Sequence, residues 1–97
     1  MEIRKLSRMP YAQAHVKVYD NGDLVLVSYV TDVIIVKDNW LTCTGTYSAT
    51  TRKHISAFML EYFSELSYYT AKHCYENGYM VNVETGEIKI NIERASF

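Results

Sequence analysis

The sequence predicts an α+β domain: an antiparallel β-meander of three to four strands, helix packed on it, and a C-terminal β-hairpin. Three observations predict this class. Apolar and polar residues alternate through the first half of the chain, with the period of two of half-buried strands. The spacing then changes to the i, i+3, i+4, i+7 pattern of an amphipathic helix, and alternation returns after Gly78. Strands, then helix, then strands is the order of α+β folds rather than of βαβ units.

The 97 residues have room for one domain, 1–97. Residues 1–10 are basic and end at the only proline, so we expect a lead-in that stays mobile until it binds something. A domain of this length buries about 60–65% of its unfolded surface, so a homodimer or a bound protein would add useful burial.

The strands of the meander are expected in the first half of the chain. Apolar and polar residues alternate from about residue 12 to residue 19. Asn21-Gly22, which follows, is the strongest short-range hairpin signal. The return strand is expected over 24–30. A β-branched run at 33–36 is apolar throughout, which indicates a central strand or one covered on both sides. A further strand is expected over 40–44.

A helix is expected to begin among the hydroxyl residues at 48–51 and to run to about residue 64. Ser48, Thr50 and Thr51 are suited to capping, because their oxygens accept from the unpaired N–H groups of the first turn. The apolar stripe of this helix is formed by Ile55, Phe58, Met59, Tyr62, Phe63 and Leu66. Leu60 lies off the stripe, so it belongs either to a second packing face or to a partner surface.

The helical pattern continues beyond the first helix, and two readings stay open. Ser64 or Ser67 caps a second helix, or the first helix continues with a bend. Gly78 ends the helical region, because glycine accepts the left-handed conformation beyond a C-terminus. The C-terminal hairpin is expected over 79–84 and 87–93. Its inward-facing residues are expected to be Ile88, Ile90 and Ile92.

The side chains available for recognition are tyrosines and two small groups of cations. A formal charge of −1 argues against a general polyanion binder. Nine tyrosines are more than a core of this size needs, and tyrosine suits both half-buried sheet edges and interfaces. The candidate partner-binding residues are Tyr19, Tyr29, Trp40, Leu60, Tyr68 and Tyr69. The candidate contacts for an anion or a nucleic acid are Arg4, Lys5, Arg8, Arg52 and Lys53.

No catalytic, metal-binding or cofactor-binding signature stands out. Nucleophilic catalysis needs a base beside the nucleophile and a third group that orients the base, and no such motif accompanies His54. The adjacent His73 and Cys74 diverge on a helix and cannot chelate one ion together. We therefore predict a protein that is not an enzyme and carries no cofactor. His54, expected at the polar edge of the first helical turn, is interpreted as a latch that bonds Tyr47 or a strand backbone.

The compartment follows from the cysteines and from the hydropathy pattern. Cys43 and Cys74 lack the spacing of a disulfide framework, which fits a reducing cytosol. No apolar run approaches the roughly 20 residues that span a bilayer, and the N-terminus lacks the apolar core of a signal peptide. We expect a cytoplasmic protein with no membrane partner.

One run of residues resembles a known group of proteins. Ser28-Tyr29-x-Thr31-x-Val33, followed by Tyr47-Ser48-x-Thr50-Thr51-x-x-His54-Ile55-x-x-Phe58, is similar to a family of small uncharacterised proteins of bacteriophages and mobile elements. The likeness covers about 28–63, and its most specific part is the motif formed by Tyr47, Ser48, Thr50, Thr51 and His54. The resemblance implies a phage-encoded accessory protein that works in the cytoplasm of a bacterial host cell. It implies no catalytic residue.

Three functional hypotheses remain. The leading one is an interaction protein that binds a host protein. In this hypothesis the chain inhibits a bacterial defence system, such as a CRISPR nuclease. The alternative is a small nucleic-acid-binding accessory protein, using the basic N-terminus and the helix start. His15, Lys17 and Tyr19 on one strand face also resemble a base-stacking platform in outline. The third is a hydrolase that uses His54.

Overall fold

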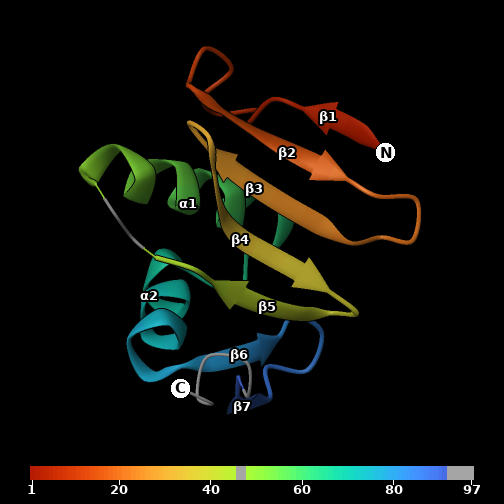
Figure 1. The fold of residues 1–97 in the computed structure, drawn as a ribbon, viewed down its shortest axis with the longest axis vertical. Helices are drawn as coiled ribbons and strands as arrows, with labels where there is room; N and C mark the ends of the chain where they lie inside the picture. The colour runs from red at the N-terminus through yellow and green to blue at the C-terminus, as the bar shows by residue number, and fades with distance from the viewer. Residues whose placement is uncertain (46–47, 92–97) are drawn as a thin grey trace.

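The computed structural model describes residues 1–45 and 48–91. Strands and helices of the described chain are ordered as follows. They are β1 (Glu2–Arg4), β2 (Ala14–Val18), β3 (Leu24–Ser28), β4 (Thr31–Lys37), β5 (Trp40–Cys43), α1 (Ala49–Tyr62), α2 (Tyr68–Asn77), β6 (Tyr79–Asn82) and β7 (Ile88–Ile90). The described strands form one antiparallel sheet of seven strands, in the order β1 to β7 (Figure 1).

The predicted meander of three to four strands is wrong, although the class is α+β. The sheet gains a strand at its N-terminal edge, because Glu2–Arg4 pairs with β2 in the expected lead-in. It also takes up the C-terminal hairpin, because β6 pairs with β5 through Leu41 and Val81. The residues of β1 are all exposed, so no alternation of burial marks them as a strand in the sequence.

The helical region consists of two helices. α2 begins after Ser67, whose backbone N–H donates to the Thr70 hydroxyl oxygen at 3.3 Å. Gly78 ends α2 with a φ of 68°, which confirms the predicted left-handed cap.

Both helices lie on the same face of the sheet, and the core lies between the two layers (Figure 1). Period-two alternation turns Val16 and Leu26 toward this layer, where they join Ile55 and Phe58 of α1 in one buried cluster. The opposite face of the sheet has no covering element among the described residues.

The inward orientation predicted for the C-terminal hairpin is wrong for its described part. Ile88 and Ile90 are 47% and 58% exposed. They belong to β7, the last strand of the described sheet, over which no described helix packs. Ile92 and Tyr47 lie outside the described residues.

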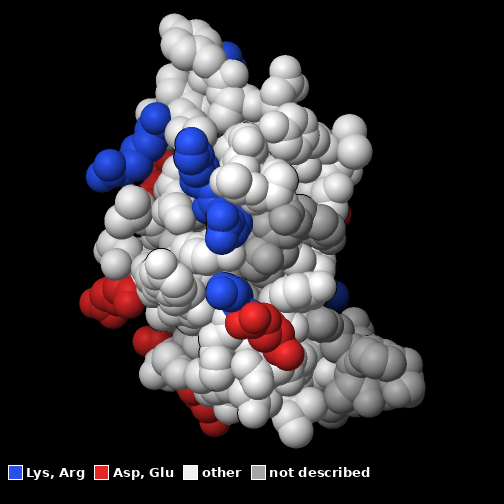
Figure 2. All heavy atoms as spheres, turned by 90° about the vertical axis from the view of Figure 1, so that its left-hand side faces the viewer, with Lys and Arg blue, Asp and Glu red and all other residues white. Residues whose placement is uncertain are grey.

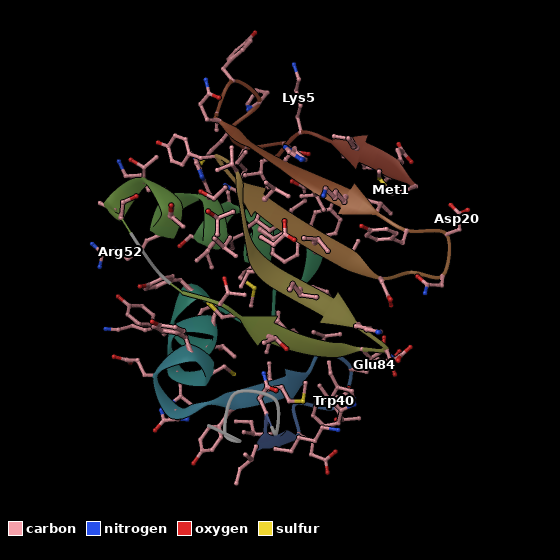
Figure 3. All side chains as sticks on the ribbon, viewed as in Figure 1. Met1, Lys5, Asp20, Trp40, Arg52 and Glu84 are labelled. Carbon is pink, nitrogen blue, oxygen red and sulfur yellow. The ribbon has the colours of Figure 1, made fainter. Side chains whose placement is uncertain are left out.

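Three charged residues mark the two ends of the sheet (Figure 3). Asp20 and Glu84 lie at the end where the β2–β3 and β6–β7 hairpins turn. Arg52 lies at the opposite end, at the start of α1.

Candidate functional site

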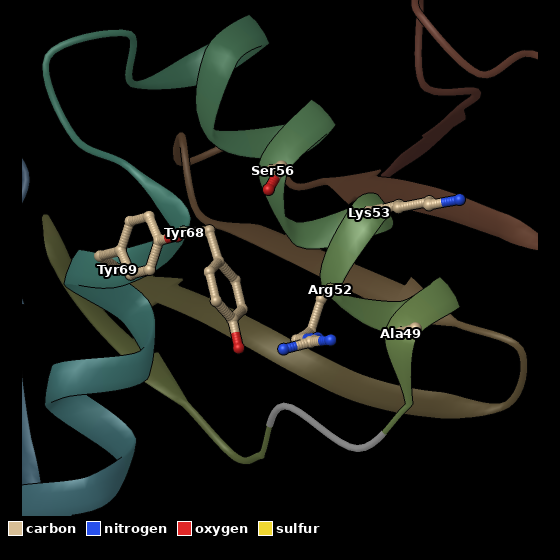
Figure 4. A pocket seen from close by; sticks show the side chains of 6 residues that line it. All are labelled: Ala49, Arg52, Lys53, Ser56, Tyr68 and Tyr69. Atoms are coloured by element: carbon tan, nitrogen blue, oxygen red, sulfur yellow. The ribbon is translucent and has the colours of Figure 1, made fainter.

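Two adjoining hollows form a groove between α1 and the start of α2. The first, of about 380 Å³, is lined by Ala49, Arg52, Lys53, Ser56, Tyr68 and Tyr69 (Figure 4). The second, of about 210 Å³, is lined by Ser56, Met59, Leu60, Leu66, Ser67, Tyr68 and Tyr69. We call these lining residues together the α1–α2 groove. The groove unites candidates that the sequence assigned to two separate roles: the cations of the helix start and the apolar and aromatic partner residues.

The caps of the two helices place these side chains. The Ser48 hydroxyl accepts from the Thr51 N–H at 3.2 Å and so fixes the first turn of α1, next to Arg52 and Lys53. The Ser67–Thr70 bond fixes the first turn of α2. The groove is thus formed by α1, by the start of α2 and by Leu66 and Ser67 of the connection between them.

The groove carries positive charge and no carboxylate. Arg52 and Lys53 are both exposed, and neither forms an ion pair with another residue of the described chain. In Figure 4 the Arg52 guanidinium points toward the hydroxyl end of Tyr68, whereas Lys53 points away from the tyrosines. No acidic residue occupies the first turn of α1. The positive end of the helix dipole therefore adds to the charge of the two side chains.

The apolar part of the groove is unusually exposed. Tyr69 is 73% exposed and Leu60 is 50% exposed. The Tyr68 ring contacts the Tyr69 ring edge-on, with centroids 5.5 Å apart, while Tyr68 itself packs against the core. This contact holds Tyr69 in place without burying it. A fixed aromatic ring beside an exposed leucine is the composition of a protein-binding hot spot.

The side of the molecule that carries the helices displays several cations. Figure 2 shows Lys and Arg side chains across its upper and central part, with Asp and Glu side chains mainly in its lower half, one acidic group adjoining the central cations. A partner that approaches this side meets a cationic surface next to the apolar groove.

His54 lies in the core, not at the polar edge predicted for it. It is 1% exposed, and its Nδ1 is hydrogen-bonded to the Ser28 hydroxyl of β3 at 2.8 Å. The Thr51 hydroxyl bonds the same Ser28 oxygen at 3.0 Å. The latch partner is therefore a strand side chain rather than a strand backbone, and Tyr47 lies outside the described residues. Ser28 is a missed site residue: it shares the inward parity of Leu24 and Leu26, and a hydroxyl at such a position needs a buried partner.

Ser28 and His54 have the residue types of a nucleophile and a base, but their setting is that of a core. Ser28 is 2% exposed, so a substrate has no approach to its hydroxyl in this conformation. Burial also lowers the pKa of the His54 imidazole, which keeps it neutral. The Tyr29 ring lies beside the His54 ring, with centroids 5.8 Å apart and the planes tilted by 49°. We interpret the arrangement as a structural latch between α1 and β3.

The remaining candidate partner residues lie away from the groove. Tyr19 is at the β2–β3 hairpin, and Tyr29 follows β3 with a φ of 57°. Trp40 lies on the sheet face opposite the helices, with the Lys89 ammonium 3.9 Å from its ring centroid. The structure therefore divides the predicted partner residues between two faces.

The N-terminal cations are not part of the groove either. Arg4 donates to both carboxylate oxygens of Glu2 at 3.0 Å, and this bond lowers the pKa of Glu2. Lys5 and Arg8 are exposed in the connection between β1 and β2. Thr50, in the first turn of α1, is exposed as well, so the buried bonds of the predicted motif come from Thr51 and His54.

The described residues contain no group of three or more His, Cys, Asp or Glu side chains that could hold a metal ion. Cys43 and Cys74 are both buried; the Cys43 thiol donates to the Gly45 carbonyl at 3.4 Å, and burial raises the pKa of Cys74. No helix within the described ranges has the length and apolar content needed to cross a membrane.

Comparison with known proteins gives a family but no relative with a described activity. Residues 3–70 match the model of a family of unknown function, DUF8033. The match begins at the second residue of β1, includes β2 to β5 and all of α1, and ends at the third residue of α2. The search of the curated proteins and the search of the solved structures gave no match.

Proposed function

Because this chain belongs to the DUF8033 family of unknown function, we propose its function from its surface. We propose that the protein acts by binding another protein, and that the α1–α2 groove receives an acidic segment of that partner. The observation that carries this proposal is the meeting of Arg52 and Lys53 with Leu60, Tyr68 and Tyr69 in one groove.

The charges of the groove specify the partner's charge. Arg52 and Lys53 are the fourth and fifth residues of α1, at the end of its first turn, where the helix dipole still disfavours positive charge. Neither has a carboxylate partner in the described part of the chain. A bound carboxylate or phosphate relieves this repulsion and gains charge-assisted hydrogen bonds. The partner's segment is therefore acidic where it meets Arg52 and Lys53.

The apolar end of the groove favours a protein over a small molecule. Small-molecule sites enclose most of their ligand, and they are lined by buried apolar groups. Here the side chains of Tyr69 and Leu60 are exposed to solvent, at 73% and 50% of their surface. Such side chains contribute most when they insert into a pocket of a partner protein. The groove thus combines an apolar anchor and a cationic end along one helix pair.

The finer form of the proposal concerns the partner's identity. We propose that the partner is a protein of a bacterial host cell, such as a defence nuclease, and that the chain is a bacteriophage accessory protein that inhibits it. Its support is the resemblance carried by Ser48, Thr50, Thr51 and His54, together with the exposed aromatic groove. The nucleic-acid role expected for the N-terminal cations has less support, because Arg4 is already engaged by Glu2.

Affinity capture with a matched pair of variants tests the proposal. Wild-type protein, Arg52→Glu/Tyr69→Ser and Arg8→Glu/Tyr11→Ser are each used as bait in a bacterial lysate. The last variant makes the same two changes in the exposed β1–β2 connection, where Tyr11 is 96% exposed. We expect one partner to be retained by wild type and by the control variant, and lost from the groove variant.

Two further results decide between the coarse and the fine proposal. Capture that is identical for all three baits, or absent for all three, contradicts binding through the groove. When a groove-dependent partner is found, plaque assays on a host that carries the matching defence system test inhibition. Equal plaque formation with wild type and with Arg52→Glu/Tyr69→Ser contradicts the anti-defence role and leaves protein binding standing.

A further inference from the structure

A row of side chains crosses the sheet on the face without helices. The strand registers place Ile3 opposite Lys17, Lys17 opposite Val25, and Val25 opposite Ile35. They continue with Ile35 opposite Thr42, and β6 and β7 add Met80 opposite Lys89. The Leu41–Val81 pairing brings Thr42 and Met80 side by side one residue further along. We call this set the cross-sheet row: Ile3, Lys17, Val25, Ile35, Thr42, Met80 and Lys89.

The cross-sheet row points away from the helices. Its residues alternate along their strands with the core residues Val16, Leu26, Ile34 and Leu41, and none of them belongs to the buried core cluster. Part of the row is hollowed: Ile35, Thr42, Met80 and Lys89 line a depression of about 490 Å³, with Trp40 and Lys37 at its side. This face of the sheet therefore contains a shallow depression and is not flat.

Two lysines lie in the row, one on β2 and one on β7. Lys17 and Lys89 are the charged members of the row, and neither is ion-paired within the described ranges. Lys37 adds a third ammonium beside the hollow, and Asp38 adds one carboxylate at its margin. The middle of the row is apolar, and the indole of Trp40 adjoins it. Cations that flank apolar and aromatic surface are the composition of single-strand binding sites.

The dimensions and the location distinguish the classes of polymer that could bind. From β2 to β7 the row crosses five strand spacings, about 24 Å, which several nucleotides of a single strand can follow. An extended peptide binds a sheet chiefly at an edge, where unpaired backbone groups offer hydrogen bonds. A sheet face offers none of these bonds, whereas nucleobases bind a face by stacking.

We propose that the cross-sheet row, with Trp40 and Lys37, binds single-stranded nucleic acid. The phosphates contact Lys17, Lys37 and Lys89, and bases lie on Ile35 and Met80, beside the indole. The Lys89 ammonium already lies 3.9 Å from the Trp40 ring centroid, so a phosphate that binds it comes next to the indole. This site is separate from the α1–α2 groove and goes beyond the function proposed for it.

The single tryptophan provides the test, because Trp40 is the only one in the chain. Purified full-length protein is titrated with an unlabelled deoxythymidine or uridine oligonucleotide while tryptophan emission is followed. We expect saturable quenching at low salt, with log K falling against log salt at a slope of about −2 for three phosphate contacts. Lys17→Glu/Lys89→Glu should bind at least about tenfold more weakly, with unchanged far-UV circular dichroism.

Lys72→Glu is the control variant. It reverses the charge of a lysine on α2, on the side of the molecule that carries the helices, and it should bind as wild type does.

Each other result overturns the proposal. No quenching by either oligonucleotide at about 50 mM salt excludes the site. Equal weakening by Lys72→Glu shows charge-driven attraction without a site, and equal quenching by poly-glutamate shows a general anion surface. An emission change that follows protein concentration alone shows that a second copy of the chain covers this face instead.

Discussion

The Nδ1 atom of His54 lies 2.8 Å from the hydroxyl oxygen of Ser28, and this bond joins α1 to the end of β3 across the core. Thr51, nearly one turn earlier in α1, bonds the same oxygen at 3.0 Å. The two bonds fix the first turn of α1 against the sheet. Since Arg52 and Lys53 lie between Thr51 and His54 in the helix, the position of the groove's cations depends on a buried polar cluster.

Replacement of His54 by Ala should destabilise the fold. The change removes a buried ring and leaves the Ser28 hydroxyl without one of its partners, so we expect the free energy of unfolding to fall by about 2–4 kcal/mol. Urea denaturation measures the change. Thr50→Ala is the control, because Thr50 is exposed in the same helical turn and should change the free energy by less than about 0.5 kcal/mol.

The same experiment separates a latch from a catalytic His54. A catalytic residue that is not structural would leave the unfolding midpoint of His54→Ala at the wild-type value while an activity is lost. A wild-type midpoint would therefore contradict the latch and return attention to the hydrolase hypothesis.

The pH dependence of stability should carry the signature of a buried neutral histidine. Burial lowers the pKa of His54 in the folded protein, so the unfolded chain binds this proton more tightly than the folded one. Stability is then highest above the ordinary histidine pKa of about 6.5 and falls as the pH drops from there through the lowered folded pKa. Urea midpoints measured from neutral to mildly acidic pH should show this decline.

Neutral substitutions assign the decline to one residue. His54→Asn should flatten the pH dependence in this window even though it lowers stability at all pH values. His73→Gln, an exposed position on α2, should leave the decline as in wild type. An unchanged slope in His54→Asn would show that another group is responsible.

The parts of the fold that the sequence predicted are those governed by local chemistry. Alternation and the Asn21-Gly22 turn located β2 and β3, and a β-branched apolar run located β4. Gly78 ended the helical region because its backbone conformation favours glycine. β1 escaped prediction because Glu2–Arg4 is held by pairing with β2 and not by burial. The pairing of β5 with β6 could not be predicted from a local pattern, because α1 and α2 lie between these two strands in the sequence.

The candidate site was predictable as residues but not as an arrangement. Arg52, Lys53, Leu60, Tyr68 and Tyr69 stood out by residue type, yet they were assigned to different roles. Their convergence depends on the turn between α1 and α2, which brings the start of α2 alongside α1. His54 was misplaced because its side chain was counted as polar by type, while its partner Ser28 lies 26 residues away in the chain.

Replacement of Gly78 by Ala tests the left-handed cap that positions β6 after α2. A Cβ at this position would meet no heavy atom within 4 Å, so the penalty is conformational alone, and we expect a loss of about 1 kcal/mol. Thermal unfolding measures it. Gly78→Asn should lose less, because asparagine tolerates this conformation better than alanine does. Equal losses for the two variants would contradict a conformational origin.

Charge reversal at the start of α1 should separate stability from binding. In wild type, Arg52 and Lys53 stand near the positive end of the helix dipole without a carboxylate partner in the described chain. Glutamate there interacts favourably with the dipole, so Arg52→Glu should raise the free energy of unfolding by about 0.3–1 kcal/mol at low ionic strength. The gain should shrink as salt is added, because exposed charges are screened.

The same variant should lose the acidic partner, so one substitution raises stability and removes function. Lys72→Glu is the stability control, because it makes the same kind of change in the middle of α2, away from both helix ends. It should gain no comparable stability. A destabilised Arg52→Glu would mean that Arg52 makes a stabilising contact in the free protein, and the main reason to expect an anionic partner would be lost. If Arg52→Glu is more stable and still binds the partner, the positive charge at Arg52 is needed neither for folding nor for binding. The binding surface then lies elsewhere.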